Sequence, residues 1–390
     1  MTPEITNPNS IESTAIEILS DLGQFTATSY WEDGPAGYLA DRARSAGLEV
    51  STDDWGNVLV ARKGSDASAH GIAFVAHTDH PGYEVVAREN EKLTLKALGG
   101  LGIAAGRAGT VIRVIAESGD TFTATVSRTT PAETELAITR QAAGWLWVDT
   151  VYATLDRGAE VNLGKLPRPA VPDLPGFSIE NDRIHMRAAD DLAGCAAILA
   201  ALEYGADQPA PGTVYGLFTR AEEVGLVGAR LAAENELIPK NTVIVSVETS
   251  SVLPGAEIGN GIVIRTGDRS ATFDNEAEVY LTRAAINTGS NNPGFKVQRQ
   301  LMSAGGCEAA AFKAFGYKVT GTAFPLGAWH NRGESGVETE FISKGDFVGG
   351  AILLAEAAKL AGTAPRGVLD RLTDPPEEEA ERLRSGRTDR

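Results

Sequence analysis

Hydrophobic positions near the N-terminus recur at helical spacing, and the chain then changes to strand-like runs. The apolar positions of IESTAIEILSDL (residues 11–22) and of residues 37–46 fall every three or four residues, which predicts two helices. LEVSTDDWGNVLVAR (residues 48–62) predicts two strands around a Gly-Asn turn. The short apolar run GIAFVAH is rich in strand formers and ends on polar residues at His77. We therefore expect two helices that lead into a sheet.

A second pattern begins at about Lys92 and continues to Leu163. Short alternating runs are separated here by Gly, Asp, Thr and Pro: KLTLKAL, TVIRVIAE, TFTATVS, WLWVDTVYA and AEVNL. Because helical periodicity is weak, we expect a small β domain inserted into an α/β domain. The next segment, KLPRPAVPDLPG (residues 165–176), carries four prolines in 12 residues and predicts a stiff extended connector back to the main domain.

Strand-like and helix-like segments alternate after this connector. IENDRIHMRAA, DLAGCAAILAALEYGA, TVYGLFT, EEVGLVGARLAAE and NTVIVSVE predict strand, helix, strand, helix and strand in that order. The alternation is typical of βαβ units around a buried, largely parallel sheet. A last strand, KVTGTAFP, and an amphipathic helix from about Lys344 to Leu360 complete the pattern.

Together these patterns predict an α/β protein with two domains, as expected for 390 residues. The main domain would be a three-layer α/β/α unit with a mainly parallel central sheet, formed by residues 1–90 and 176–362. A small barrel-like β domain at residues 91–175 would be inserted into it. Residues 363–390 would form a highly charged tail.

The net charge, the cysteine count and the lengths of the apolar runs indicate which kinds of binding partner and which compartment to expect. The formal net charge of −17, from 35 Lys and Arg against 52 Asp and Glu, opposes binding to nucleic acid or to an anionic membrane surface. The two cysteines, Cys195 and Cys307, are too few for a disulfide framework and lack the spacing of a zinc motif. The sequence shows no signal-peptide pattern and no apolar run of about 18 residues. We therefore expect a cytoplasmic protein without nucleic-acid or membrane partners.

Candidate chemistry begins at the end of the strand GIAFVAH. His77 and Asp79 form an HxD element at the carboxyl edge of the predicted sheet, where open α/β proteins bind their ligands. The Asp79 carboxylate can orient the imidazole or accept its second N–H. A chance pair in a turn is the alternative interpretation. His80 has no evident partner in the sequence, and we assign it no role.

Two acidic pairs follow later predicted strands. Asp190 and Asp191 lie between a strand and a helix. Asp190 could be a metal ligand, while Asp191 caps the helix or supports the ligand. Glu222 and Glu223 lie in the equivalent place after the next strand. A hydrolase that uses metal-activated water needs one carboxylate on the metal and a free one to accept the proton, and adjacent glutamates can divide these tasks. Ordinary helix capping and first-turn Glu are the structural alternatives.

Glu248 ends the strand IVSV, and His330 lies in a loop after KVTGTAFP. Neither residue is informative alone. Five strand ends or following loops nevertheless present a His, Asp or Glu, and two imidazoles with three carboxylates suit two zinc-like ions that share one carboxylate.

These motifs resemble a known family. AHTDHPGYEV, RAADDLAGCA, TRAEEVGLVGA, VSVETS, GGCEAAAF and WHNRG occur in the order and approximate spacing of the TET-like (glutamyl/leucyl) aminopeptidases, a branch of the dinuclear zinc peptidase clan, over roughly residues 10–362. The resemblance implies that Asp190 bridges two metals. It further implies that His77 and Glu248 complete one site, Glu223 and His330 complete the other, Glu222 is the general base and Asp79 supports His77. A cis peptide between Asp190 and Asp191 is also implied.

The chain departs from this family pattern at three places. Glu248 stands where the family usually has Asp, His80 where it has Glu, and Cys307-Glu308 where it has Thr-Asp. A Glu in place of Asp keeps the ligand chemistry but changes its reach, so metal preference stays open. The other changes lie near the expected substrate pocket and leave residue specificity open.

The sequence as a whole predicts an aminopeptidase that removes N-terminal residues from peptides with two divalent ions, zinc, or alternatively cobalt or manganese. The resemblance further implies a homo-oligomer, either a dimer or a dodecamer, in which the inserted β domain covers the site and forms an interface. One alternative is an N-acyl amino acid deacylase or carboxypeptidase of the same clan, with Arg187 or Arg332 reading a substrate carboxylate. Another is a metal-free binding or scaffold protein, which predicts lost ligands, whereas all five are present.

Overall fold

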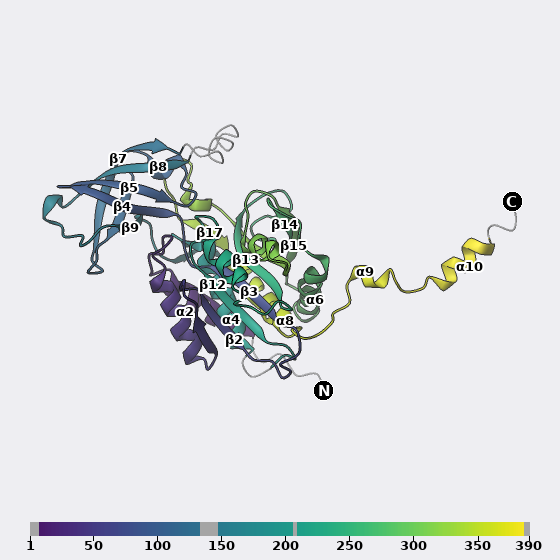
Figure 1. The fold of residues 1–390 in the computed structure, drawn as a ribbon. Coiled ribbons are helices and arrows are strands. Elements are labelled where there is room, and N and C mark those ends of the chain that lie inside the picture. Colours follow the sequence, from purple (N-terminus) through teal and green to yellow (C-terminus); the bar gives the residue numbers. More distant parts are fainter. Residues whose placement is uncertain (1–7, 133–146, 206–208, 386–390) are drawn as a thin grey trace.

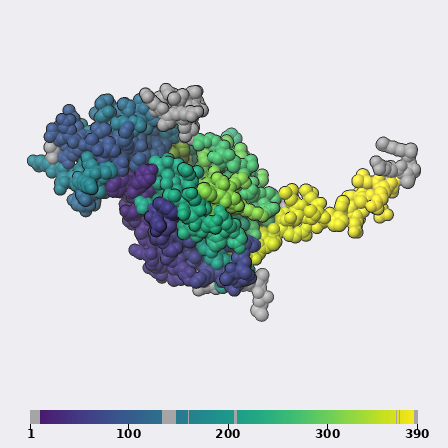
Figure 2. Space-filling view, in the orientation of Figure 1, coloured from purple at the N-terminus to yellow at the C-terminus, as the bar shows by residue number. Residues whose placement is uncertain are grey.

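The computed structural model describes residues 8–132, 147–205 and 209–385. An α/β body and a closed β-barrel form two lobes, and the C-terminal tail extends away from the body (Figures 1 and 2). This arrangement confirms the predicted fold class.

The body is built on an eight-stranded sheet. Its strands lie in the order β1 (Glu49–Thr52), β2 (Val58–Arg62), β12 (Val214–Thr219), β3 (Ile72–His77), β13 (Val243–Ser251), β16 (Lys318–Leu326), β14 (Ile262–Asp268) and β15 (Val297–Met302). The four central strands β12, β3, β13 and β16 are mutually parallel. β1, β2 and β14 join antiparallel, and β15 pairs in parallel with β14.

Helices cover both faces of this sheet because its central strands are apolar on both sides. In β3, which is buried throughout, Ile72, Phe74 and Ala76 pack into a core with helices α1 (Pro8–Leu22), α2 (Asp33–Ser45), α4 (Ala189–Tyr204), α6 (Asn275–Asn291) and α8 (Lys344–Ala358). Ala73 and Val75 pack on the opposite face with α5 (Val227–Glu234) and α7 (Glu308–Ala314). The alternation of side chains along one strand therefore produces the three layers.

The barrel has its own apolar core and six strands. They close in the order β4 (Gly82–Glu89), β5 (Lys92–Leu98), β8 (Val148–Leu155), β7 (Thr121–Pro131), β6 (Val111–Ile115) and β9 (Arg168–Pro172). The barrel therefore begins at Gly82 and not at residue 91, because β4 pairs with β5 and β9.

Two sequence predictions in this region are wrong. The proline-rich segment is not only a connector, since its residues 168–172 form β9 and close the barrel. Prolines are tolerated there because β9 shares only three residue pairs with each neighbouring strand, so few ladder hydrogen bonds are needed. AEVNL is not a strand but a 3-10 turn, η2 (Gly158–Glu160), with irregular chain after it. Its alternation reflects burial of Val161 and Leu163 in the barrel core.

The segment IENDRIHMRAA also differs from its prediction as one strand of the main sheet. It forms a hairpin of β10 (Ser178–Glu180) and β11 (Arg183–Met186), which joins β17 (Glu340–Ser343) in a separate antiparallel sheet. The turn residues Asn181 and Asp182 both have positive φ, 48° and 64°, as a two-residue hairpin turn of type I′ requires.

The tail carries two short helices, α9 (Val368–Arg371) and α10 (Glu377–Ser385), and no residue of α10 is buried. Two further 3-10 turns, η1 (Ile103–Gly106) and η3 (Trp329–Asn331), lie in the barrel and beside the main sheet. Among the described residues, no helix combines the length and apolar character needed to cross a membrane.

Candidate metal centre and active-site cleft

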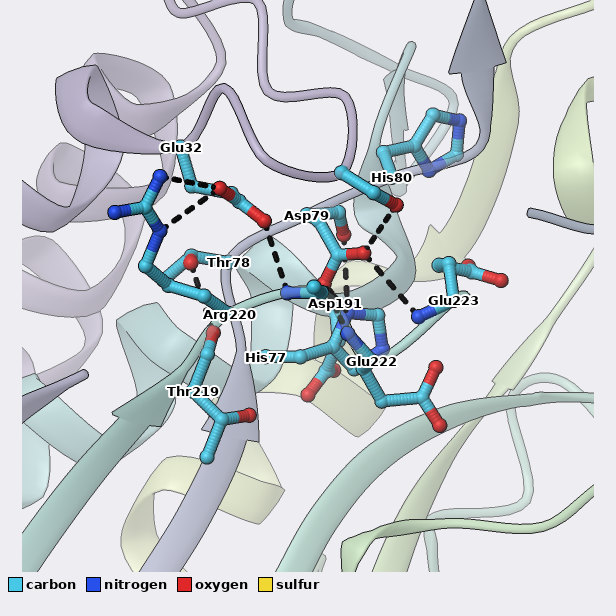
Figure 3. A network of polar contacts seen from close by, with 12 residues as sticks. Glu32, His77, Thr78, Asp79, His80, Asp191, Thr219, Arg220, Glu222 and Glu223 are labelled. Atoms are coloured by element: carbon cyan, nitrogen blue, oxygen red, sulfur yellow. Dashed lines mark hydrogen bonds and ion pairs between the residues drawn. The ribbon is translucent and has the colours of Figure 1, made fainter. Parts of the chain in front are cut away.

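Three of the predicted ligands come from neighbouring parallel strands. β3 ends at His77, which lies opposite Thr219 at the end of β12, and Glu248 lies in β13 on the other side of β3. Glu222 and Glu223 follow β12 directly (Figure 3). Because parallel strands bring their carboxyl ends to one edge, these side chains meet there.

The other two predicted ligands come from irregular backbone outside the main sheet. Asp190 stands at the start of α4 with non-helical φ and ψ of −83° and 104°, and its peptide bond to Asp191 is cis. His330 lies in η3 with a positive φ of 55°. Local sequence patterns do not specify such conformations.

All five residues converge into two groups that share Asp190. One group contains His77, Asp190 and Glu248, the other Asp190, Glu223 and His330, and in each the candidate ligand atoms lie within 4.8 Å of one another. His77 Nε2 lies 3.3 Å from Asp190 Oδ1, and His330 Nε2 lies 3.7 Å from Asp190 Oδ2 and 3.3 Å from Glu223 Oε1. A third group, His77, Glu222 and Glu223, meets the same distance limit.

The donor set suits divalent cations. Asp190 Oδ1 and Glu248 Oε1 are buried and have no hydrogen-bond partner in the described part of the chain. Buried carboxylate oxygens without a partner are costly, and a cation placed between them removes that cost. Three carboxylates and two imidazoles are also a ligand combination found for zinc and related metals.

Backbone carbonyl groups orient both imidazole rings. His77 Nδ1 lies 3.0 Å from the carbonyl oxygen of Asp79, and His330 Nδ1 lies 2.8 Å from that of Gly100 in the barrel. Each contact suits an N–H donor at Nδ1, which leaves Nε2 as the nitrogen that faces the carboxylates. Burial lowers the pKa of His330 to about 4, so its ring is neutral at physiological pH, as a metal ligand must be.

Asp79 contacts His77 and also holds a second segment. Its carboxylate Oδ1 lies 3.5 Å from His77 Nδ1, within ion-pair distance, while the Asp79 carbonyl oxygen is closer at 3.0 Å. The carboxylate also accepts hydrogen bonds from the backbone N–H groups of Glu222 (2.9 Å) and Glu223 (3.2 Å), and from the Ser29 hydroxyl (2.6 Å). Figure 3 shows Asp79 beside the start of this loop. Asp79 therefore holds the loop that carries both glutamates.

A second contact network supports the same loop, and no motif in the sequence indicates it. Glu32, fully buried, accepts a hydrogen bond from the Ala221 backbone (2.8 Å) and pairs with Arg220 at 2.9 Å (Figure 3). Ala221 has a positive φ of 52°, and α5 begins only at Val227. Glu222 and Glu223 are therefore not first-turn helix residues, so that alternative interpretation does not apply.

Glu222 lines the cleft and is partly buried. Burial raises the pKa of its carboxyl well above the usual range, and nearby carboxylates such as Glu223 add to this effect. A raised pKa is the property expected of a carboxylate that receives and returns a proton near neutral pH.

His80 has two partners, contrary to the sequence analysis. Its Nδ1 lies 2.9 Å from the Asp190 carbonyl oxygen, and its Nε2 lies 3.0 Å from Asn331 Oδ1. Burial lowers its pKa to about 4. His80 therefore links the end of β3 to both irregular segments as a neutral ring.

The candidate ligands face a cleft of about 610 Å³. The barrel contributes Gly99, Gly100 and Trp147 to its lining, and β14 contributes Arg265. Arg265 is only 1% exposed, and its Nε and Nη1 have no hydrogen-bond partner among the described residues.

The two arginines suggested by the sequence lie elsewhere, and neither lines the cleft. Arg187 donates to the carbonyl groups of Leu174 and Phe25, and the Arg332 guanidinium lies over the rings of Trp147 and Trp329.

The three-layer fold and the acidic and histidine groups at its sheet edge define a metal-dependent hydrolase. The model of the M42 glutamyl aminopeptidase family matches residues 56–335, and this chain belongs to that family. It is a metal-dependent aminopeptidase, which confirms the resemblance seen in the sequence. No functionally curated protein matches the chain at a significant level.

Solved structures share the fold. The TET1 peptidase of Pyrococcus horikoshii, which can assemble into a tetrahedron or a large octahedral shell, is 24% identical with a TM-score of 0.70, covering 89% of this chain and 99% of the other. A TET aminopeptidase from Thaumarchaeota archaeon SCGC AB-539-E09 is 23% identical with a TM-score of 0.72, covering 88% and 96%. The aminopeptidase APDkam598 of Desulfurococcus kamchatkensis is 20% identical with a TM-score of 0.72, covering 92% and 99%.

Proposed function

We propose that this aminopeptidase works with two divalent ions, zinc, or alternatively cobalt or manganese. His77, Asp190 and Glu248 would hold one ion, and Asp190, Glu223 and His330 the other. The observation that carries the proposal is the convergence of five residues into two groups with Asp190 in common. When bound, such ions lower the pKa of water and polarise a carbonyl group.

In this proposal Glu222 is the general base. It lines the cleft next to Glu223, and Asp79 fixes its backbone. Because Glu223 and His330 already form a ligand group with Asp190, Glu222 is left free to accept the proton of the attacking water and pass it to the leaving amine. Asp79 acts through Glu222 and Glu223 and is a positioning residue.

Arg265 points to the class of substrate. A buried guanidinium with unpaired nitrogens at a cleft wall suits a carboxylate partner. Since the peptide bond is cleaved after the N-terminal residue, we propose that Arg265 pairs with an acidic side chain of that residue. The description of the family as glutamyl aminopeptidases supports this preference.

The test is a substrate panel measured with and without a chelator. Glu, Asp, Leu and Lys anilides and N-acylated amino acids are assayed after restoring zinc, cobalt or manganese to the metal-free enzyme. We expect metal-dependent cleavage of free-amine substrates, fastest for Glu or Asp. Cleavage that needs no metal, or of acylated substrates only, would contradict the proposed function.

Arg265→Met separates substrate recognition from support of the metal centre. We expect kcat/KM for the acidic anilides to fall about 100-fold, as for loss of a buried charge pair, with Leu anilide changed little. Arg269→Met is the control, because Arg269 is exposed and also lines the cleft. An equal fall for all substrates would make Arg265 a counter-charge for buried carboxylates such as Glu248 and not a specificity residue.

We also propose that the chain forms a homo-oligomer, a dimer or a dodecamer, with the barrel as lid and interface. The assemblies of the Pyrococcus horikoshii TET1 peptidase support the oligomer. The barrel residues that line the cleft support the role of the barrel as a lid. A cytoplasmic location agrees with the two free, buried cysteines. Sedimentation of the purified protein tests the oligomer, and a purely monomeric species would contradict it.

A further inference from the structure

Two of the proposed ligands lack the support of the main sheet. Asp190 stands in non-helical backbone at the start of α4, and His330 has a positive φ in η3. Their segments are far apart in sequence, yet Asp190 Oδ2 and His330 Nε2 lie 3.7 Å apart. Contacts from elsewhere must therefore hold the two backbones at a defined separation.

Glu340 makes these contacts. It is the first residue of β17 and has no exposed surface. Its Oε2 accepts a hydrogen bond from the Asp190 backbone N–H at 3.0 Å, and its Oε1 accepts one from the His330 backbone N–H at 2.7 Å. One carboxylate thus joins the backbones of two ligands.

The small second sheet places Glu340 for this task. β17 pairs antiparallel with β11, and Glu340 lies opposite Met186, shortly before Asp190 in the chain. On its other side, Gly327 and Phe341 form an isolated bridge that brings the chain before His330 alongside β17. Both ligand segments therefore leave from positions beside Glu340.

We infer that Glu340 is a positioning residue that sets the geometry of the metal group formed by Asp190, Glu223 and His330. This inference rests on the proposed function, because it concerns ligands of the proposed metals. The Glu340 carboxyl group presents one acceptor oxygen to each of the two backbone N–H groups. A glutamine of the same shape would keep one acceptor and turn its NH2 group toward the other backbone donor.

The experiment compares Glu340→Gln with Glu338→Gln, which makes the same chemical change at an exposed residue two positions earlier. Titration calorimetry of the metal-free proteins measures affinity and stoichiometry, and the visible spectrum of the cobalt-loaded proteins reports ligand geometry. Thermal unfolding without metal reports stability separately. We expect Glu340→Gln to weaken the binding of one ion about 10- to 100-fold, as for loss of other supporting groups around a metal, and to alter the cobalt spectrum.

We further expect kcat to fall while KM changes little, and Glu338→Gln to behave as wild type. Glu340→Asp keeps both acceptors but shortens the side chain, so its affinity should lie between wild type and Glu340→Gln. If Glu340→Gln does not fold, Glu340→Asp is compared with wild type in its place. Wild-type metal affinity and cobalt spectrum in the folded variants would overturn the inference, even if stability fell. A wild-type protein that binds no divalent ion would instead overturn the proposed function.

Discussion

The proposed metal centre combines two regions that are held in different ways. His77 and Glu248 belong to adjacent parallel strands, so the backbone ladder of the sheet sets their separation. Asp190 and His330 stand in irregular segments, and one side chain, Glu340, joins their backbones. Glu223 is intermediate, since it follows a strand but is held by Asp79. A ladder tolerates many sequences, whereas the irregular region depends on individual carboxylates.

The largest expected effect is that of removing the proposed general base while the contacts that hold both regions stay in place. Glu222→Gln should lower kcat by about 10²- to 10⁴-fold, because the amide cannot accept the proton of water. Both ions should stay bound, since Glu222 is not a proposed ligand. Steady-state kinetics with metal analysis of the same sample measures this. Glu236→Gln, at an exposed site, is the control, and retained activity in Glu222→Gln would remove Glu222 from its proposed role.

Asp79→Asn weakens the contacts that hold the loop after β12, and its effect can be compared with that of Glu340→Gln. The amide keeps one acceptor and loses the other, which should misplace Glu222 and Glu223 and lower kcat about 10- to 100-fold. We expect a smaller loss of metal affinity than in Glu340→Gln, because Asp79 holds the backbone of one proposed ligand, Glu223, whereas Glu340 holds the backbones of two. Kinetics and calorimetry on both variants measure the difference, with Asp54→Asn at an exposed position as control. A greater loss of metal affinity in Asp79→Asn than in Glu340→Gln would contradict the view that Glu340 contributes more to metal binding.

The smallest effect concerns His80, which connects the two regions. Its pKa is about 4 in the folded chain because of burial, against about 6.5 when unfolded, so the unfolded chain binds more protons between these values. The resulting stability is present above pH 6.5 and is lost as pH falls toward 4. Between pH 7 and pH 5 the loss should be about 2 kcal/mol. Because His330 contributes a similar loss in both proteins, denaturant unfolding of the metal-free protein should show a pH dependence that is smaller by this amount in His80→Gln than in wild type. Equal pH dependence would refute the assignment.

Several features could be predicted from the sequence because their signals are local. Apolar runs located β3, β12, β13 and β16, and each was followed or ended by a residue type that suits a metal. The predicted strand ends brought His77, Glu222, Glu223 and Glu248 to one sheet edge, as the structure has them. The predictions were wrong where the local sequence pattern does not show which strands pair with each other. β9 was hidden by its prolines, and β4 joined the barrel although its sequence continues directly from the end of β3.

Local patterns along the chain predict the order of elements, the inserted β region and the residue types available for chemistry, since periodicity and strand ends depend on neighbouring residues. Three contacts are visible only in the folded chain: Asp79 holds the Glu222 loop, Glu340 joins Asp190 to His330, and Arg265 rather than Arg187 lines the cleft. A buried carboxylate or guanidinium takes its partners from distant segments. Such pairings depend on how the chain packs and leave no periodic pattern along it.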